Sequence, residues 1–187
     1  MGKLIATMNM TLDGYCDHTA MMADDEIHQH YAELLRDAGA LLYGRITYQL
    51  MESYWPSVVN NPTGNNAMDL FAVEMDRASK IVFSRSLQQV AWKNSSLKNE
   101  INREEILDLK HQTAKNSYAG SPSLIVALAN MGLVDEFQIA VHPIIAGSGL
   151  SLFKNIQHSI PLKLYKTKSF SCGAIILYYE SQLVETS

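Results

Sequence analysis

In three stretches of this 187-residue chain, glycine, hydroxyl or cationic residues directly follow the end of a predicted short strand. They are Gly44-Arg45-Ile46-Thr47, Ser84-Arg85-Ser86 and Gly120-Ser121-Pro122-Ser123. Glycine lets a ligand come close to the backbone, and the N–H groups at a helix start bind anions. Arginine can hold a phosphate through two parallel hydrogen bonds. Together the three stretches predict a site for a phosphorylated ligand.

Each stretch also has an ordinary structural explanation. Gly44 can be a turn residue beside a solvated Arg45, Ser84 can cap a turn, and Ser121-Pro122 suits any helix start. Neither GxGxxG nor GxxxxGK[ST] occurs, so the usual dinucleotide and P-loop fingerprints are absent. Two arginines at separate strand ends would nevertheless suit the extra phosphate that distinguishes NADP from NAD.

Carboxylates and aromatic residues supply further candidates for chemistry. If a nicotinamide nucleotide were to deliver hydride to an imine or carbonyl carbon, a carboxyl group in an apolar pocket could supply the proton that completes the reduction. Asp13, in TLDGY, is the first candidate and Glu26 the second, although Asp-Gly is also a common turn pair. Tyr54 and Trp55 could stack on a flat heterocycle or pack in the core.

The elements that must position these residues follow from hydrophobic periodicity. Expected strands are Lys3–Met10, Ala40–Tyr43, Lys80–Phe83, Val90–Trp92 and Glu136–His142. Expected helices are residues 24–38, Arg45–Glu52, Met68–Arg77, Arg103–Lys110 and a segment that starts at Ser121-Pro122 and ends before Gly132. Alternation predicts one more buried strand within residues 111–119, yet that segment is polar.

Short apolar strands that alternate with helices indicate an α/β fold with a mostly parallel sheet. Leu162–Ser169 and Ala174–Glu180 have the pattern of an antiparallel C-terminal hairpin. We expect a single domain over residues 1–187, a length typical of one domain. In such sheets ligands bind beyond the carboxyl ends of the strands, where the three stretches lie.

Composition limits the class of protein. The formal charge of −4 gives no basic surplus for nucleic acid, and no apolar run is long enough to span a bilayer. Only Cys16 and Cys172 occur, without CxxC, which is typical of a reducing cytoplasm and gives no zinc motif. His28 and His30 do not share a helical face, so we expect no metal site there.

Four segments in order resemble the dihydrofolate reductase-like family. They are LLYGRITYQLMESYWP, KIVFSRSL, GSPSLIVAL and GLVDEFQIAVHPIIAGSGLSLF. They are most similar to stand-alone homologues of the C-terminal reductase domain of the riboflavin-biosynthesis deaminase-reductase. The likeness runs from Lys3 to Glu180. It implies a three-layer α/β/α fold, NADPH as hydride donor and usually a homodimer.

The resemblance also implies roles for individual residues. It assigns Gly44, Arg45 and Thr47 to the 2′-phosphate side of NADPH, Ser84 and Arg85 to the adenine end, Gly120, Ser121, Ser123 and Leu124 to the pyrophosphate, and Asp13 to the nicotinamide. Glu26 matches only loosely the carboxylate that grips the pterin in dihydrofolate reductases.

We therefore expect an NADPH-dependent reductase of a small planar heterocycle, of pyrimidine or pteridine type, similar to 5-amino-6-(5-phosphoribosylamino)uracil reductase. Three alternatives stay open: genuine dihydrofolate reductase activity, a non-catalytic dinucleotide-binding protein of the same fold, and a structural or partner-binding dimer that binds no nucleotide. The polar segment before Gly120 favours the second alternative, because family members usually carry an apolar strand there.

Overall fold

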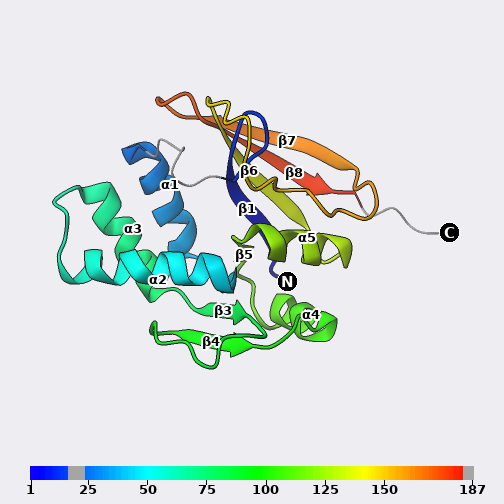
Figure 1. Ribbon diagram of the computed structural model, residues 1–187, viewed down its shortest axis with the longest axis horizontal. Helices are drawn as coiled ribbons and strands as arrows, with labels where there is room; N and C mark the ends of the chain where they lie inside the picture. The colour runs from blue at the N-terminus through cyan, green and yellow to red at the C-terminus, as the bar shows by residue number, and fades with distance from the viewer. Residues whose placement is uncertain (17–23, 183–187) are drawn as a thin grey trace.

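A single sheet organises the part of the chain that the computed structural model describes, residues 1–16 and 24–182. Its eight described strands lie in the order β4-β3-β2-β5-β1-β6-β8-β7 (Figure 1). Neighbouring strands from β4 to β6 are parallel, and β8 and β7 add an antiparallel hairpin. The strands are β1 (Leu4–Thr11), β2 (Leu41–Gly44), β3 (Lys80–Phe83), β4 (Ser95–Lys98), β5 (Ser117–Ala119), β6 (Glu136–His142), β7 (Leu162–Ser169) and β8 (Ile175–Ser181).

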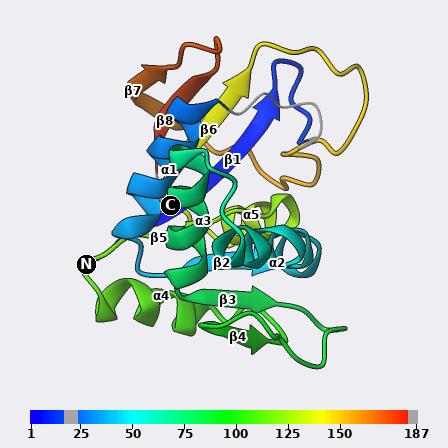
Figure 2. The same ribbon diagram turned by 90° about the vertical axis from the view of Figure 1, so that its left-hand side faces the viewer.

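Helices cover both faces of this sheet, as Figure 2 shows. Helices α1, α2 and α3 lie on one face, and α4 and α5 lie on the other. The described helices are α1 (Asp25–Arg36), α2 (Arg45–Asn60), α3 (Asn66–Arg77), α4 (Arg103–Gln112) and α5 (Pro122–Asn130). The predicted three-layer, mostly parallel α/β fold with an antiparallel C-terminal hairpin is confirmed. None of the described helices has the length and apolar composition that a membrane span requires.

Strand β2 shows how alternating side chains build the two cores. Leu42 packs with α4 and α5, whereas Leu41 and Tyr43 pack with α1, α2 and α3. All three are at most 5% exposed. Burying a side chain of this size contributes about 1.5–3 kcal/mol, so even a four-residue strand is held firmly.

Strand β5 resolves the polar segment 111–119. Only its last three residues, Ser117–Ala119, form a strand, between β1 and β2. Ser117 donates its N–H to the Lys3 carbonyl, and Tyr118 donates to the Ala40 carbonyl. Because both neighbours supply backbone partners, the segment needs few apolar side chains. Ser117 and Ala119 are small and almost fully buried.

One predicted strand and one predicted helix end are wrong. Val90–Trp92 is not a strand, because the Trp92 N–H donates to side chains of α2, Tyr48 Oη and Glu52 Oε1, at 3.0 Å each. The strand next to β3 is instead β4. The helix expected to end at Glu52 continues through Pro56 to Asn60. Contacts of Trp55 with α3 and the burial of Val58 stabilise this extension of about two turns.

Strand β7 forms one edge of the described sheet, and most of its side chains are exposed. Its pairing with β8 is irregular between Leu164 and Lys166, which is the mark of a β-bulge. In the middle of the sheet, β2, β5 and β1 carry residues that form the candidate site. Their carboxyl ends lie at one edge of the sheet because the strands are parallel.

Candidate functional site

The ends of β2 and β5 are joined directly. The Gly44 N–H donates to the Ser121 hydroxyl oxygen at 2.8 Å, so two of the three predicted stretches meet. A groove of about 460 Å³ opens beside this contact. We call it the strand-end groove; its polar lining includes Gly44, Arg45, Thr47, Ser121, Ser123 and Lys154.

Two helix N-termini face the strand-end groove. Helix α2 begins at Arg45 and α5 begins at Pro122, and neither has a side chain that caps its N-terminal N–H groups. The Ser121 hydroxyl, which could have capped α5, accepts from Gly44 instead. Uncapped N–H groups and the positive end of the helix dipole favour an anion, and Arg45 and Lys154 add cationic side chains.

Other predicted cofactor residues lie outside the lining of this groove. The Ser84 hydroxyl accepts from the N–H groups of Ser86 and Leu87, so it closes a turn, and Arg85 next to it is exposed. Leu124 is a core residue on the buried side of α5 and is 5% exposed. The predicted roles of these three residues in cofactor binding thus remain predictions without support from the lining.

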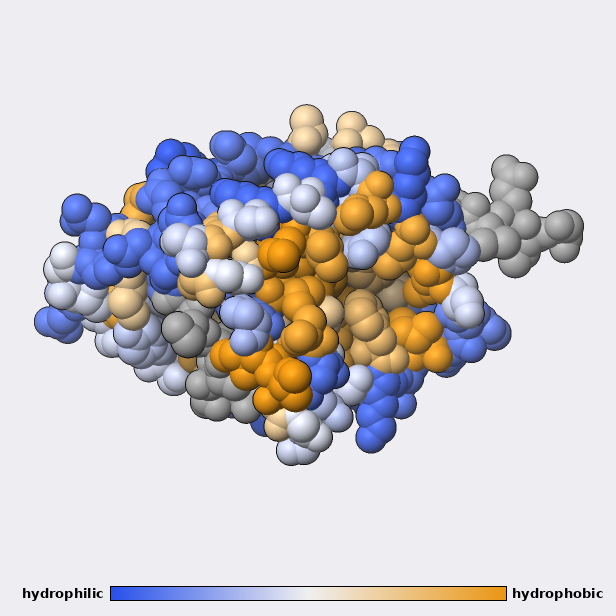
Figure 3. Space-filling view, turned by 90° about the horizontal axis from the view of Figure 1, so that it is seen from above, coloured by the Kyte–Doolittle hydropathy of each residue, from blue (hydrophilic) through white to orange (hydrophobic). Residues whose placement is uncertain are grey.

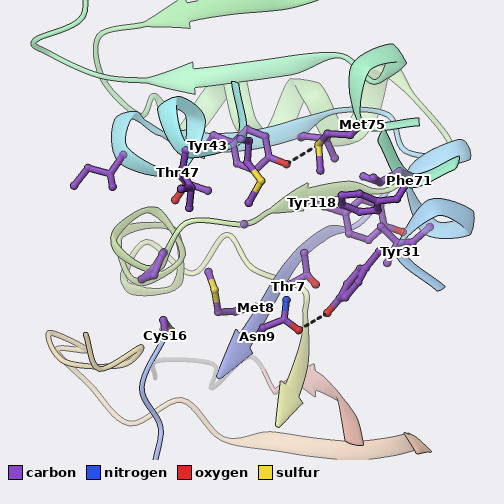
Figure 4. Close-up of a pocket in the computed structure, with 18 of the residues that line it drawn as sticks. Thr7, Met8, Asn9, Cys16, Tyr31, Tyr43, Thr47, Phe71, Met75 and Tyr118 are labelled. Carbon is purple, nitrogen blue, oxygen red and sulfur yellow. Dashed lines mark hydrogen bonds between the residues drawn. The ribbon is translucent and has the colours of Figure 1, made fainter. Parts of the chain in front are cut away.

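A second space lies against the other face of the sheet, between it and α1, α2 and α3. We call it the apolar cavity; it measures about 390 Å³. Four aromatic side chains surround it: Tyr31, Tyr43, Phe71 and Tyr118 (Figure 4). Gly120 also lines it, and a Cβ there would lie 3.1 Å from the Tyr43 ring. A flat ligand would find stacking partners here.

The two spaces share a wall. Ile46, Thr47, Pro122 and Leu150 line both the strand-end groove and the apolar cavity. Ile46 is 74% exposed and Leu150 is 57% exposed, so both lie at the mouth. Figure 3 shows hydrophobic side chains gathered around a hollow on this side of the molecule. A ligand in the groove and one in the cavity would therefore meet at these residues.

Neither predicted catalytic carboxylate lines the apolar cavity. Asp13 accepts from the Thr11 hydroxyl at 2.6 Å and from the N–H groups of Ala146 and Gly147 at 3.0 and 2.7 Å. The Thr11 hydroxyl and these N–H groups lower the pKa of Asp13 to about 2. Glu26 accepts from the N–H and hydroxyl of Ser171, which lowers its pKa. Both side chains hold loops together as carboxylates.

The polar residues of the apolar cavity were missed by the sequence reasoning. Thr7 and Asn9 lie at alternate positions of β1 and both line the cavity. The apolar pattern of Lys3–Met10 predicts a strand but does not single out these two residues. The Asn9 carbonyl oxygen lies 3.3 Å from the Tyr31 hydroxyl and 3.1 Å from His142 Nε2. Burial lowers the pKa of His142, which is 1% exposed, so the ring is neutral at pH 7.

Tyr54 and Trp55 also lie outside the described lining of the cavity. Tyr54 is 44% exposed on α2. Trp55 packs edge-on against Phe71 with 4.6 Å between ring centres, and its Nε1 donates to Met51 sulfur. Met51 and Phe71 do line the cavity, so Trp55 supports the wall from behind.

Among residues 1–16 and 24–182, no group of three His, Cys, Asp or Glu side chains is placed to hold a metal ion. His28 contacts Trp55 and Phe71, while His30 contacts Tyr31 and Phe170. The two histidines therefore point to different neighbours.

The strand order and the paired strand ends define a dihydrofolate reductase-like fold, and solved structures agree. A candidate riboflavin biosynthesis protein from Shewanella sp. PV-4 superposes with a TM-score of 0.75 at 18% identity, covering 97% of this chain and 99% of that one. Dihydrofolate reductase from Enterococcus faecalis, complexed with NADP(H), gives a TM-score of 0.62 at 15% identity and 96% coverage of both chains.

The sequence itself identifies the family. Residues 2–176 match the model of the RibD C-terminal domain, and the chain belongs to that family. It is 29% identical over 181 residues to the uncharacterized protein YyaP of Bacillus subtilis (strain 168), covering 95% of this chain and 94% of that protein. The resemblance drawn from the four sequence segments is confirmed, and the family supports an oxidoreductase activity.

Proposed function

We propose that the protein is an NADPH-dependent reductase that delivers hydride to a carbon atom of a small planar heterocycle. One observation carries the proposal: a cationic groove with uncapped helix N-termini shares a wall with an apolar, aromatic cavity. A cofactor phosphate suits the groove, and a flat substrate suits the cavity. When bound, NADPH supplies the hydride.

The side chains of the chain bind and orient in this proposal. Arg45 holds the 2′-phosphate, and the N–H groups at the start of α5 together with Ser121 and Ser123 hold the pyrophosphate. Gly44 keeps the groove open, because a side chain there would reach toward Ser121 and Ser123. Excluding water from the shared wall protects the transferred hydride.

For Asp13 we propose a positioning role. The loop at Ala146 and Gly147, which its carboxylate binds, leads to Leu150 in the shared wall. The Cys16 N–H also donates to the Leu150 carbonyl at 2.8 Å. Since Asp13 carries no proton at neutral pH, we propose that water supplies the proton that completes the reduction.

The alternatives find less support. Dihydrofolate reduction needs a carboxylate against the pterin, and none lines the apolar cavity within the described residues. A non-catalytic dinucleotide-binding protein would not need a formed aromatic cavity next to its groove. The cytoplasmic location expected from the two cysteines and the homodimer implied by the resemblance stay predictions.

Comparing NADPH with NADH for an Arg45→Ala variant tests the proposed function. We expect Arg45→Ala to weaken NADPH binding by about tenfold or more, as loss of a charge-assisted phosphate contact does, and to leave NADH binding nearly unchanged. Nucleotide fluorescence or calorimetry measures both dissociation constants.

Two further variants make this comparison sharper. Lys115→Ala, on an exposed loop away from the groove, serves as the matched control and should bind both nucleotides normally. Arg85→Ala tests the predicted contact with the adenine end. Equal weakening of NADPH and NADH in Arg45→Ala, or no binding of either nucleotide to the unmodified protein, would contradict the proposal.

A further inference from the structure

The described lining of the apolar cavity carries no formal charge. Among its described lining residues there is no Lys, Arg, His, Asp or Glu. Residues 17–23, whose structure is not described, contain Asp17 and His18 but neither Lys nor Arg. Moving a phosphate or another ionised group from water into such a space is costly without a charged partner. The cavity therefore favours an uncharged ligand.

Two hydrogen bonds to its carbonyl oxygen fix the orientation of the Asn9 side chain in this lining. His142 Nε2 lies 3.1 Å from its carbonyl oxygen, and the Tyr31 hydroxyl lies 3.3 Å from the same atom. His142 Nδ1 is buried and has no hydrogen-bond partner among the described residues. An unpaired buried N–H is costlier than an unpaired acceptor, so the ring proton belongs on Nε2, where it is bonded.

This tautomer determines which end of the Asn9 amide faces the ligand. With Nε2–H and the Tyr31 hydroxyl both donating to Oδ1, the amide cannot turn its nitrogen toward them. In Figure 4 the Asn9 oxygen faces Tyr31 and the nitrogen points toward the interior of the cavity. No bond to Asn9 Nδ2 is found within the described residues. A pair of N–H donors is thus available to a ligand.

We propose that Asn9, held by His142 and Tyr31, is the specificity-determining residue of the apolar cavity: its Nδ2 group donates to an oxygen acceptor of an uncharged planar ligand. This deepens the proposed function, on which it rests, because it describes the substrate side of the same site. It also predicts that a phosphorylated substrate is disfavoured, whereas the cofactor phosphates belong to the separate strand-end groove.

The experiment compares two probes of equal shape. α-Tetralone has a carbonyl oxygen, and its exocyclic methylene analogue has a CH₂ group in the same place. Dissociation constants for both are measured by calorimetry with the unmodified protein and with Asn9→Leu. We expect the ratio of ketone to methylene affinity to be about fivefold higher in the unmodified protein than in Asn9→Leu, the size of one buried hydrogen bond.

Two more variants separate positioning from simple structural support. Asn66→Leu, at an exposed asparagine in the first turn of α3, should keep the ratio of the unmodified protein. Tyr31→Phe combined with His142→Leu keeps Asn9 but removes both donors, so the ratio should fall although Asn9 is present. If the double variant does not fold, Tyr31→Phe alone should give a smaller fall.

A hydroxy-α-tetralone and its phosphate monoester test the charge requirement, and we expect the ester to bind at least about tenfold more weakly. An unchanged ketone-to-methylene ratio in Asn9→Leu, no binding of either probe, or tighter binding of the ester would overturn the inference. NADPH binding to the same variants is measured separately. If NADPH binds nowhere while the ketone preference holds, the proposed cofactor fails and the role of Asn9 stands.

Discussion

Gly44 and Ser121, 77 positions apart, are joined by a hydrogen bond of 2.8 Å from the glycine N–H to the serine hydroxyl. This bond fixes the end of β2 against the start of α5, and the strand-end groove opens beside it. The helix that Ser121 precedes is left without a side-chain cap. The Ser121 hydroxyl thus does not cap α5, and its bond to Gly44 instead sets the distance between the two helix N-termini that are candidates for phosphate binding.

Replacing Ser121 by alanine tests this coupling. We expect the free energy of unfolding to fall by about 1 kcal/mol, since the Gly44 N–H loses its partner, and NADPH to bind several-fold more weakly. Chemical denaturation and nucleotide titration measure the two effects. Ser53→Ala, at an exposed serine that bonds only within α2, should change neither. Unchanged binding in Ser121→Ala would remove this serine from the cofactor site.

Asp13→Asn distinguishes a positioning role from proton donation. The amide keeps the shape but weakens the bonds to Ala146 and Gly147, so we expect weaker substrate and NADPH binding with a modest change in kcat. The pH dependence of kcat should keep its form. If Asp13 were the proton donor, kcat would instead fall by two or more orders of magnitude and lose a titrating group.

The stability of the protein should depend on His30 in mildly acidic solution. Burial and Lys168 lower its pKa to about 4, and the Lys168 ammonium lies 3.1 Å from its Nδ1. Between about pH 6.5 and pH 4, His30 is protonated in the unfolded chain but neutral in the folded chain. The free energy of unfolding is therefore highest above about pH 6.5 and decreases as the pH falls toward 4.

Denaturation at several pH values, compared with His30→Gln, isolates this effect. The difference in unfolding free energy between the two proteins should shrink by about 1–3 kcal/mol between pH 7 and pH 4. A difference that stays constant over this range would show that His30 is protonated in the folded state as readily as in the unfolded one.

Trp55 and Tyr54 should behave differently although they are adjacent. Trp55→Ala removes the ring that packs on Phe71, so we expect a loss of about 2–4 kcal/mol of stability. Tyr54→Ala, at a side chain that is 44% exposed, should cost less than about 1 kcal/mol. Thermal unfolding measures both. If Tyr54→Ala weakens substrate binding while stability is retained, the predicted stacking role of Tyr54 is supported.

Local patterns predicted the fold well, because hydrophobic periodicity reports directly on buried faces. The apolar run Lys80–Phe83 and the helix start at Ser121-Pro122 are found where expected. Trp92 was misassigned because the partners of its backbone N–H, Tyr48 and Glu52, are side chains 44 and 40 residues away along the chain. The three-residue strand β5 has no apolar pattern of its own, since its neighbours supply the hydrogen bonds.

The candidate site was only partly predictable for the same reason. Gly44, Arg45 and Ser121 have residue types that suggest phosphate binding wherever they occur. The types of Asn9 and His142 do not by themselves indicate a role in the site, because that role depends on a contact between residues 133 positions apart in the sequence. Asp13 has the right type for catalysis, but only the position of Ala146 and Gly147 shows what its carboxylate binds.

The irregular outer strand β7 has a consequence for how copies of this protein could associate. Lys163, Lys166 and Lys168 follow one another along it, and the bulge near Leu164 breaks the spacing of its outward N–H and C=O groups. Another strand would meet like charges and mismatched partners there, which discourages continuation of the sheet from one molecule into the next. Two copies would therefore not associate by pairing β7 with β7, and this edge of the sheet is protected from aggregation.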